Sequence, residues 1–144
     1  MDKIIQEKIS ADHLLYVSLK YTKTGDVILN LLKRWTSMID EAISGLLTKA
    51  KKDKKITLIP IAPKMKVIET RNVYKKSPEI IDAIDLYEFF KRIPSLEYLK
   101  ENEFRKNITL RVKDGENWIE INLDKLKEYS LVLEKFISKI KQIL

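Results

Sequence analysis

The sequence predicts a single domain, residues 1–144, with a mainly helical α+β fold: a bundle of long amphipathic helices with a β-hairpin near residues 107–122. Three observations lead to this prediction. Residues 27–50 carry one long apolar stripe at helical spacing, and residues 124–144 carry a second. Between them, two runs of alternating apolar and polar residues flank Asp114-Gly115, a favoured hairpin turn. A chain of this length can form one hydrophobic core.

The first predicted helix covers residues 3–21 and ends at a polar break, residues 22–25. Thr24 is expected to be the N-cap of the next helix, and Asp26 suits its positive end. Two amphipathic helices joined by so few residues form an antiparallel hairpin, although one helix bent at Gly25 is an alternative. The predicted apolar stripe of the first helix is Ile5, Ile9, Leu15, Leu19 and Tyr16.

The central element is the predicted helix over residues 27–50. At about 1.5 Å per residue it is roughly 35 Å long, so the rest of the chain is expected to pack on it. Trp35 lies within its stripe and is expected in the core. The stripe is Val27, Ile28, Leu31, Leu32, Trp35, Met38, Ile39, Ala42, Ile43, Leu46 and Leu47.

The middle of the chain is less regular. Residues 56–59 and 65–70 are predicted as short strands. Pro60 and Pro63 end the first one and confine it to the edge of a sheet or to an irregular segment. A helix is predicted over residues 77–91, with Ser77 as N-cap and Pro78 in the first turn. Its expected buried face is Ile80, Ile81, Ala83, Ile84, Tyr87 and Phe90. Ser95 is expected to cap a further short helix through Tyr98 and Leu99.

The hairpin turn at Asp114-Gly115 fixes a register in which Lys113 faces Glu116, Arg111 faces Trp118, Leu110 faces Ile119 and Ile108 faces Ile121. In that register Ile108, Leu110, Val112, Ile119 and Ile121 share an apolar face. Asp124 is expected to cap the last helix, whose heptad-like stripe favours packing along the 27–50 helix. That stripe consists of Leu126, Tyr129, Leu133, Phe136, Ile140 and Ile143.

Composition excludes several kinds of site. The chain has no cysteine, which excludes disulfides, thiol catalysis and cysteine-bound zinc or iron–sulfur centres. Three glycines are too few for a glycine-rich phosphate loop, and no metal or hydrolase motif is present. The single histidine, His13, has no partner at suitable spacing. The close carboxylates, Asp82 with Asp85 and Glu101 with Glu103, are expected to be solvated. We therefore expect no cofactor, no metal and no recognisable catalytic residue.

No run of about 18 uncharged apolar residues occurs, so we expect no membrane span and no membrane partner. The first residues lack the basic-then-apolar layout of a secretion signal, which predicts a cytoplasmic protein. The chain uses much lysine, glutamate and isoleucine. This bias is typical of thermophiles, and an AT-rich genome is the alternative source.

The net charge of +7 is concentrated in one segment. Residues 1–48 hold 6 basic and 6 acidic side chains, whereas residues 49–76 hold 10 basic and 2 acidic. Clustered cations favour a polyanion, because each neutralised phosphate releases a counterion. The alternative is a solvated basic loop. The candidate polyanion-binding residues are Lys51, Lys52, Lys54, Lys55, Lys64, Lys66, Arg71, Tyr74, Lys75 and Lys76.

Trp118 is a candidate interface residue on the polar face of the hairpin. There it is expected to stack on the Arg111 guanidinium, to anchor a protein interface, or to be covered by another element.

The hairpin of helices that contains Ala11-Asp12-His13-Leu14-Leu15-Tyr16 and Trp35 resembles the helical bundles of the HEPN superfamily. That superfamily includes ribonucleases and helical partners of minimal nucleotidyltransferases. Its nuclease motif places a histidine four to six residues after an arginine, and no arginine precedes His13. The resemblance therefore implies a binding or partner role rather than nuclease activity.

Two functional hypotheses follow. The first is a non-enzymatic binding protein that contacts RNA, DNA or another polyanion, such as an acidic protein, through residues 49–76. The second is a structural or self-associating helical module, which forms a homodimer or binds a protein partner through Trp118 and its wide apolar stripes. An enzyme with an unfamiliar site is a third alternative.

Overall fold

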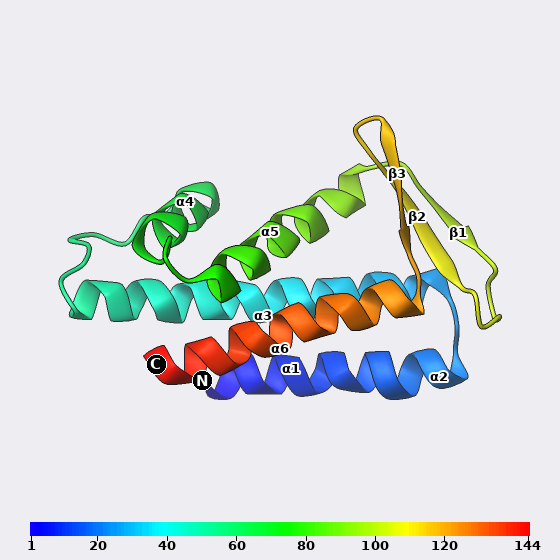
Figure 1. The fold of residues 1–144 in the computed structure, drawn as a ribbon, viewed down its shortest axis with the longest axis horizontal. Helices are drawn as coiled ribbons and strands as arrows, with labels where there is room; N and C mark the ends of the chain where they lie inside the picture. Colours follow the sequence, from blue (N-terminus) through cyan, green and yellow to red (C-terminus); the bar gives the residue numbers. More distant parts are fainter.

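The computed structural model describes all 144 residues and has the predicted mainly helical α+β fold. Long helices lie along one another, with a small sheet at one end of the molecule and a short helix, α4, towards the other (Figure 1). One hydrophobic cluster of 31 buried residues joins the helices and the sheet. The elements are α1 (Asp2–His13), a π-helical turn η1 (Leu14–Ser18), α2 (Leu19–Tyr21), α3 (Gly25–Lys52), α4 (Pro63–Val73), α5 (Pro78–Arg92), a 3₁₀ turn η2 (Ile93–Ser95), β1 (Tyr98–Glu101), β2 (Thr109–Asp114), β3 (Asn117–Ile121) and α6 (Leu123–Ile143).

Helix α3 confirms the predicted central helix. The Thr24 hydroxyl accepts a hydrogen bond of 3.3 Å from the Val27 amide, so Thr24 is the N-cap that the sequence predicts. Every residue of the predicted stripe except Val27 is buried. Trp35 is in the core and stacks on Phe90, with 5.9 Å between the ring centroids. The helix is covered by α1 on one side and by α4 and α5 on another.

The first helix is correctly placed, but part of its predicted stripe is wrong. The helical run is interrupted by the π turn η1 and ends at Tyr21. Ile9 and Tyr16, predicted inside, are exposed, because isoleucines occur on two sides of the helix and α3 covers the side of Ile4. The buried residues of this run are Ile4, Ala11, Leu15 and Leu19.

Neither of the two strands predicted in the basic segment forms. Residues 56–59 are an irregular segment, the alternative that the prolines left open, whereas the strand predicted at residues 65–70 is wrong because these residues lie within α4. Pro63 occupies the first turn of α4, where its fixed φ favours a helix and its missing amide costs nothing. The apolar residues of α4 do not share one face, so its sequence carries no clear helical stripe.

The short helix predicted from Ser95 to Leu99 is also wrong. A 3₁₀ turn ends at Ser95, and Tyr98–Glu101 forms β1, which pairs antiparallel with β2. The sheet therefore has three strands in the order β1-β2-β3. Strand β1 has no buried residue of its own. Its structure depends on pairing with β2, which local sequence does not reveal.

The hairpin is confirmed, but its register differs from the predicted one by two residues. Asp114 pairs with Asn117, so Gly115 and Glu116 form the turn and Arg111 faces Glu120. Gly115 has φ +69, a conformation that glycine adopts without strain at the first central position of a hairpin turn. A shift of two keeps each side chain on its face, and Ile108, Leu110, Val112 and Ile121 are buried as expected.

Helix α5 agrees with the prediction, whereas α6 differs in its cap and its main partner. Ser77 precedes α5 but forms no capping hydrogen bond through its side chain. The Asn122 side chain, not Asp124, caps α6 by accepting from the Lys125 amide at 2.9 Å. Helix α6 packs mainly on α5 rather than on α3, and the Phe90 and Tyr129 rings meet edge to face at 5.3 Å.

None of the helices combines the length and apolar character that crossing a lipid bilayer requires. The cytoplasmic location stays a prediction from the sequence.

Candidate functional site

The basic segment, residues 49–76, lies at the end of the molecule opposite the sheet (Figure 1). It comprises the last turn of α3, an irregular loop, α4 and the turn that leads into α5. Ten basic and two acidic side chains are thus gathered at one end of the fold. One of the two acids, Asp53, forms an ion pair with Lys49 at 3.3 Å.

Most of the predicted lysines are open to solvent. None of the lysines in the candidate set forms an ion pair with a carboxylate, and only Lys66 is partly covered. We call the exposed ones the free lysines: Lys51, Lys52, Lys54, Lys55, Lys64, Lys75 and Lys76.

Arg71 is not available in the same way, because it joins α4 to α5. Its Nη2 donates to Asp85 Oδ1 at 2.7 Å, and its Nε donates to Glu88 Oε1 at 3.1 Å. Burial alone would lower the pKa of Arg71, but the hydrogen bonds to Glu88 and Asp85 outweigh it and raise that pKa. Because two carboxylates bind its guanidinium, Arg71 stabilises the packing of α4. Unlike the free lysines, it already has carboxylate partners.

Tyr74 is a buried structural residue rather than a stacking platform. Its side chain is 6% exposed, and its hydroxyl donates to the main-chain carbonyl of Leu46 at 3.0 Å. Burial raises the pKa of Tyr74, and the nearby Asp53 carboxylate raises it further. The Lys55 ammonium lies 5.7 Å from its ring centroid. Stacking of a base on Tyr74 would require the ring to leave the core.

Four aliphatic side chains that sequence reasoning did not assign to the site protrude among the free lysines. Leu58 and Ile61 are 75% and 93% exposed, and Met65 and Ile68 are each 50% exposed. The sequence shows these apolar residues beside two prolines. Because the segment is predicted as two strands, half of its residues are expected to face a core, and the exposure of these side chains is therefore not predicted.

Arg111 and Trp118 meet as the sequence suggested, but from different register positions. The Arg111 guanidinium lies 5.1 Å from the Trp118 ring centroid, although its partner directly across the ladder is Glu120. Arg111 also lies near the carboxylates of Glu101 (3.6 Å) and Glu120 (3.9 Å). Trp118 is 37% exposed. The contact is therefore a diagonal cross-strand pair on the outer face of the sheet.

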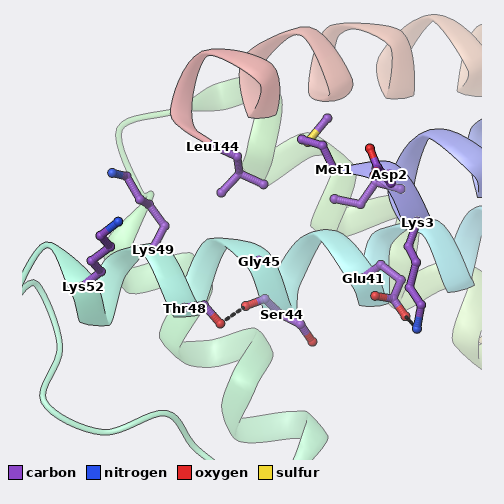
Figure 2. Close-up of a pocket in the computed structure, with 11 residues that line it drawn as sticks. Met1, Asp2, Lys3, Glu41, Ser44, Gly45, Thr48, Lys49, Lys52 and Leu144 are labelled. Atoms are coloured by element: carbon purple, nitrogen blue, oxygen red, sulfur yellow. Dashed lines mark hydrogen bonds and ion pairs between the residues drawn. The ribbon is translucent and has the colours of Figure 1, made fainter.

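A hollow of about 850 Å³ lies where the start of α1 and the end of α6 meet α3 (Figure 2). Several of its polar groups have partners within the fold: Lys3 lies 4.0 Å from Glu41, and the Thr48 hydroxyl donates to the Ser44 carbonyl at 2.9 Å. Of the candidate lysines only Lys52 lines it. The free lysines thus form an open surface and do not converge on this hollow.

The histidine and several of the carboxylates considered in the sequence are exposed or have partners elsewhere in the fold. His13 is exposed, and its neighbour Asp12 is paired with Lys8 at 2.7 Å. Asp85 is held by Arg71, and Glu103 accepts a hydrogen bond of 3.1 Å from the Gly25 amide. No group of three or more histidines and carboxylates lies close enough to hold a metal ion.

Comparison of the chain with protein-family models, with curated proteins and with solved structures gave no match. The resemblance to HEPN-like bundles stays a prediction, and the functional argument rests on the fold and its side chains.

Proposed function

We propose that this chain is a non-enzymatic binding protein that contacts a polyanion through the free lysines of residues 49–76. The observation that carries the proposal is the set of exposed lysines without carboxylate partners at one end of the molecule. Elsewhere, acidic and basic residues are nearly balanced, with 12 basic and 13 acidic side chains in residues 77–144. Positive potential is thus expected to be strongest at this end, where it would attract an anionic ligand.

The test is equilibrium binding to a labelled heparin oligosaccharide, a single-stranded oligonucleotide and a duplex at about 50 mM and 200 mM salt. The variant K51Q/K64Q/K75Q/K76Q removes four free lysines. The matched control, K106Q/K113Q/K127Q/K141Q, removes four exposed lysines of the β1–β2 loop, the sheet and α6 that also have no ion-pair partner.

At about 50 mM salt we expect the first variant to lose about tenfold or more in affinity and the control to lose much less, since only the first removes ligand contacts. Equal losses of affinity in the two variants would show that only the net charge matters and would contradict the proposed binding site. Absence of binding to every polyanion at about 50 mM salt, where the electrostatic contribution is strongest, would remove the function.

A second candidate function is self-association or binding of a protein partner. It is favoured by an exposed apolar strip on the outer side of α1 and η1, where Ile9 is 62% exposed and Tyr16 and Val17 are also exposed. Sedimentation velocity over a range of concentrations tests self-association. A homodimer that I9S/Y16S weakens would support self-association. A protein that is monomeric at the highest concentration would contradict it.

A further inference from the structure

The exposed surface of α4 and its preceding loop combines aliphatic side chains with lysines. We call it the basic aliphatic surface: Leu58, Ile61, Lys64, Met65, Ile68 and Lys75. Met65 and Ile68 are three positions apart within α4 and lie on one side of this helix, and Leu58 and Ile61 lie in the loop that precedes it. Lys64 lies in the first turn of α4, and Lys75 lies in the turn that follows the helix.

The part of this surface that α4 contributes lies on the side of the helix that faces away from the core, and apolar side chains are exposed there. The inward side holds the buried Thr70 and the partly buried Val67, with Tyr74 at the end of the helix. The outward side presents Met65 and Ile68, and Ile61 in the preceding loop is 93% exposed. Clustered exposed aliphatic residues are unfavourable in water and mark an interaction surface, whereas single ones need no explanation.

Charge and shape decide what could cover this surface. A second copy is disfavoured, because the segment carries 10 basic and 2 acidic side chains and would meet the same charge. Single-stranded nucleic acid uses aromatic and guanidinium planes, but Tyr74 is buried and Arg71 is held by Asp85 and Glu88. A partner helix would need a groove, and the hollows of about 850, 420 and 360 Å³ are lined by residues outside 53–76.

We propose that the basic aliphatic surface docks on an anionic phospholipid membrane, with the aliphatic side chains among the acyl chains and the lysines at the phosphates. A peripheral site of this kind needs apolar side chains together with cations, because each contribution alone gives weak binding. The inference rests on the proposed function and identifies the polyanion as the phosphates of anionic phospholipids. It departs from the sequence expectation of no membrane partner, which considered only segments that span a bilayer.

The experiment uses the full chain and vesicles of phosphatidylcholine, alone or mixed with phosphatidylserine, at about 50 mM salt. The variant I61S/M65S removes two exposed aliphatic side chains from the surface. The control F104S/L131S removes two comparably exposed apolar side chains from the β1–β2 loop and α6, and K51Q/K64Q/K75Q/K76Q tests the lysines. Because the chain has no cysteine, I61C and L131C each take a single environment-sensitive dye.

We expect the wild type to sediment with the anionic vesicles and not with phosphatidylcholine alone. I61S/M65S and the lysine variant should each reduce binding about tenfold, whereas F104S/L131S should bind normally. A dye at position 61 should shift to the blue with anionic vesicles, and a dye at position 131 should not.

Three outcomes would overturn the inference: no vesicle binding, vesicle binding that I61S/M65S leaves unchanged, or lysine-dependent binding of nucleic acid but not of vesicles. In each of these cases the proposed function survives as long as the lysine variant loses its polyanion affinity. If that variant instead binds all polyanions like the wild type, the proposed function fails together with the inference.

Discussion

The hydroxyl of Tyr74 donates a hydrogen bond of 3.0 Å to the carbonyl of Leu46, and this contact fixes the end of α4 against the C-terminal part of α3. The two residues are 28 positions apart in the chain. Together with the bonds from Arg71 to Asp85 and Glu88, this contact holds the basic segment on the bundle. The lysines of the segment therefore project from an ordered support.

Replacing Tyr74 by phenylalanine should separate stability from binding. Y74F keeps the ring in the core and removes one hydrogen bond, so we expect a loss of about 1 kcal/mol in the free energy of unfolding. Urea denaturation measures it. Heparin affinity should stay within about twofold, since the ring is buried and a single neutral bond is lost. A large loss of affinity in a folded Y74F protein would return Tyr74 to the binding site.

Arg71 offers a charge-conserving test. R71K keeps the positive charge but cannot reproduce the fork that spans Asp85 and Glu88, so we expect a loss of about 1 kcal/mol in stability. Polyanion affinity should be nearly unchanged, because the overall charge is retained. The opposite pattern, normal denaturation with reduced affinity, would show that the guanidinium itself contacts the ligand.

Buried tyrosines should make the fold sensitive to alkali. Burial and, to a smaller extent, the Glu128 carboxylate raise the pKa of Tyr129 to about 12. Burial and the hydrogen-bonded Asp40 carboxylate raise the pKa of Tyr87 above its ordinary value. An unfolded tyrosine loses its proton near pH 10, whereas these stay protonated in the fold. Their contribution is complete below about pH 10 and is lost as the pH rises through the folded pKa.

The measurement is urea denaturation at about pH 9 and pH 11. Stability should fall between the two, and the fall should be smaller in Y129F than in the wild type. Y21F is the control, since the Tyr21 ring is 78% exposed. If Y129F and Y21F show the same fall as the wild type, Tyr129 is not the group responsible.

The diagonal pair on the sheet predicts a coupling energy. Arg111 and Trp118 should couple by about 0.5 to 1 kcal/mol in a double-mutant cycle of R111A and W118A. The same variants examine the interface hypothesis for Trp118. If W118A changes sedimentation behaviour as well as stability, Trp118 contacts another molecule. If only stability changes, its role is confined to the sheet.

The elements that could be predicted are those whose local sequence is compatible with only one secondary structure and one buried face. Helix α3 has a single stripe and a threonine cap, so its start and its buried face follow from the sequence. Helix α4 has apolar residues on two sides, and α1 has isoleucines on two sides, so periodicity does not select the buried face. Strand β1 exists because β2 pairs with it, and that partner lies about ten residues further along the chain.

In the candidate site too, some features follow from the local sequence and others depend on the fold. Exposure of the lysines follows from their charge, because an unpaired ammonium is costly to bury. The structural roles of Arg71 and Tyr74 depend on Asp85, Glu88 and Leu46, which the fold brings near from other helices. The apolar side of the basic aliphatic surface could have been found only by recognising Pro63 as the first residue of a helix.

The most direct test of the account is to map the contact surface. In a ¹H–¹⁵N correlation spectrum titrated with a heparin oligosaccharide, we predict that amide shifts change first and most at residues 51–66 and 75–76. Amides of β1–β3 and of the outer side of α6 should change little. Shifts centred on the sheet or on α6, or spread evenly over the molecule, would contradict the claim that the basic segment is the binding site.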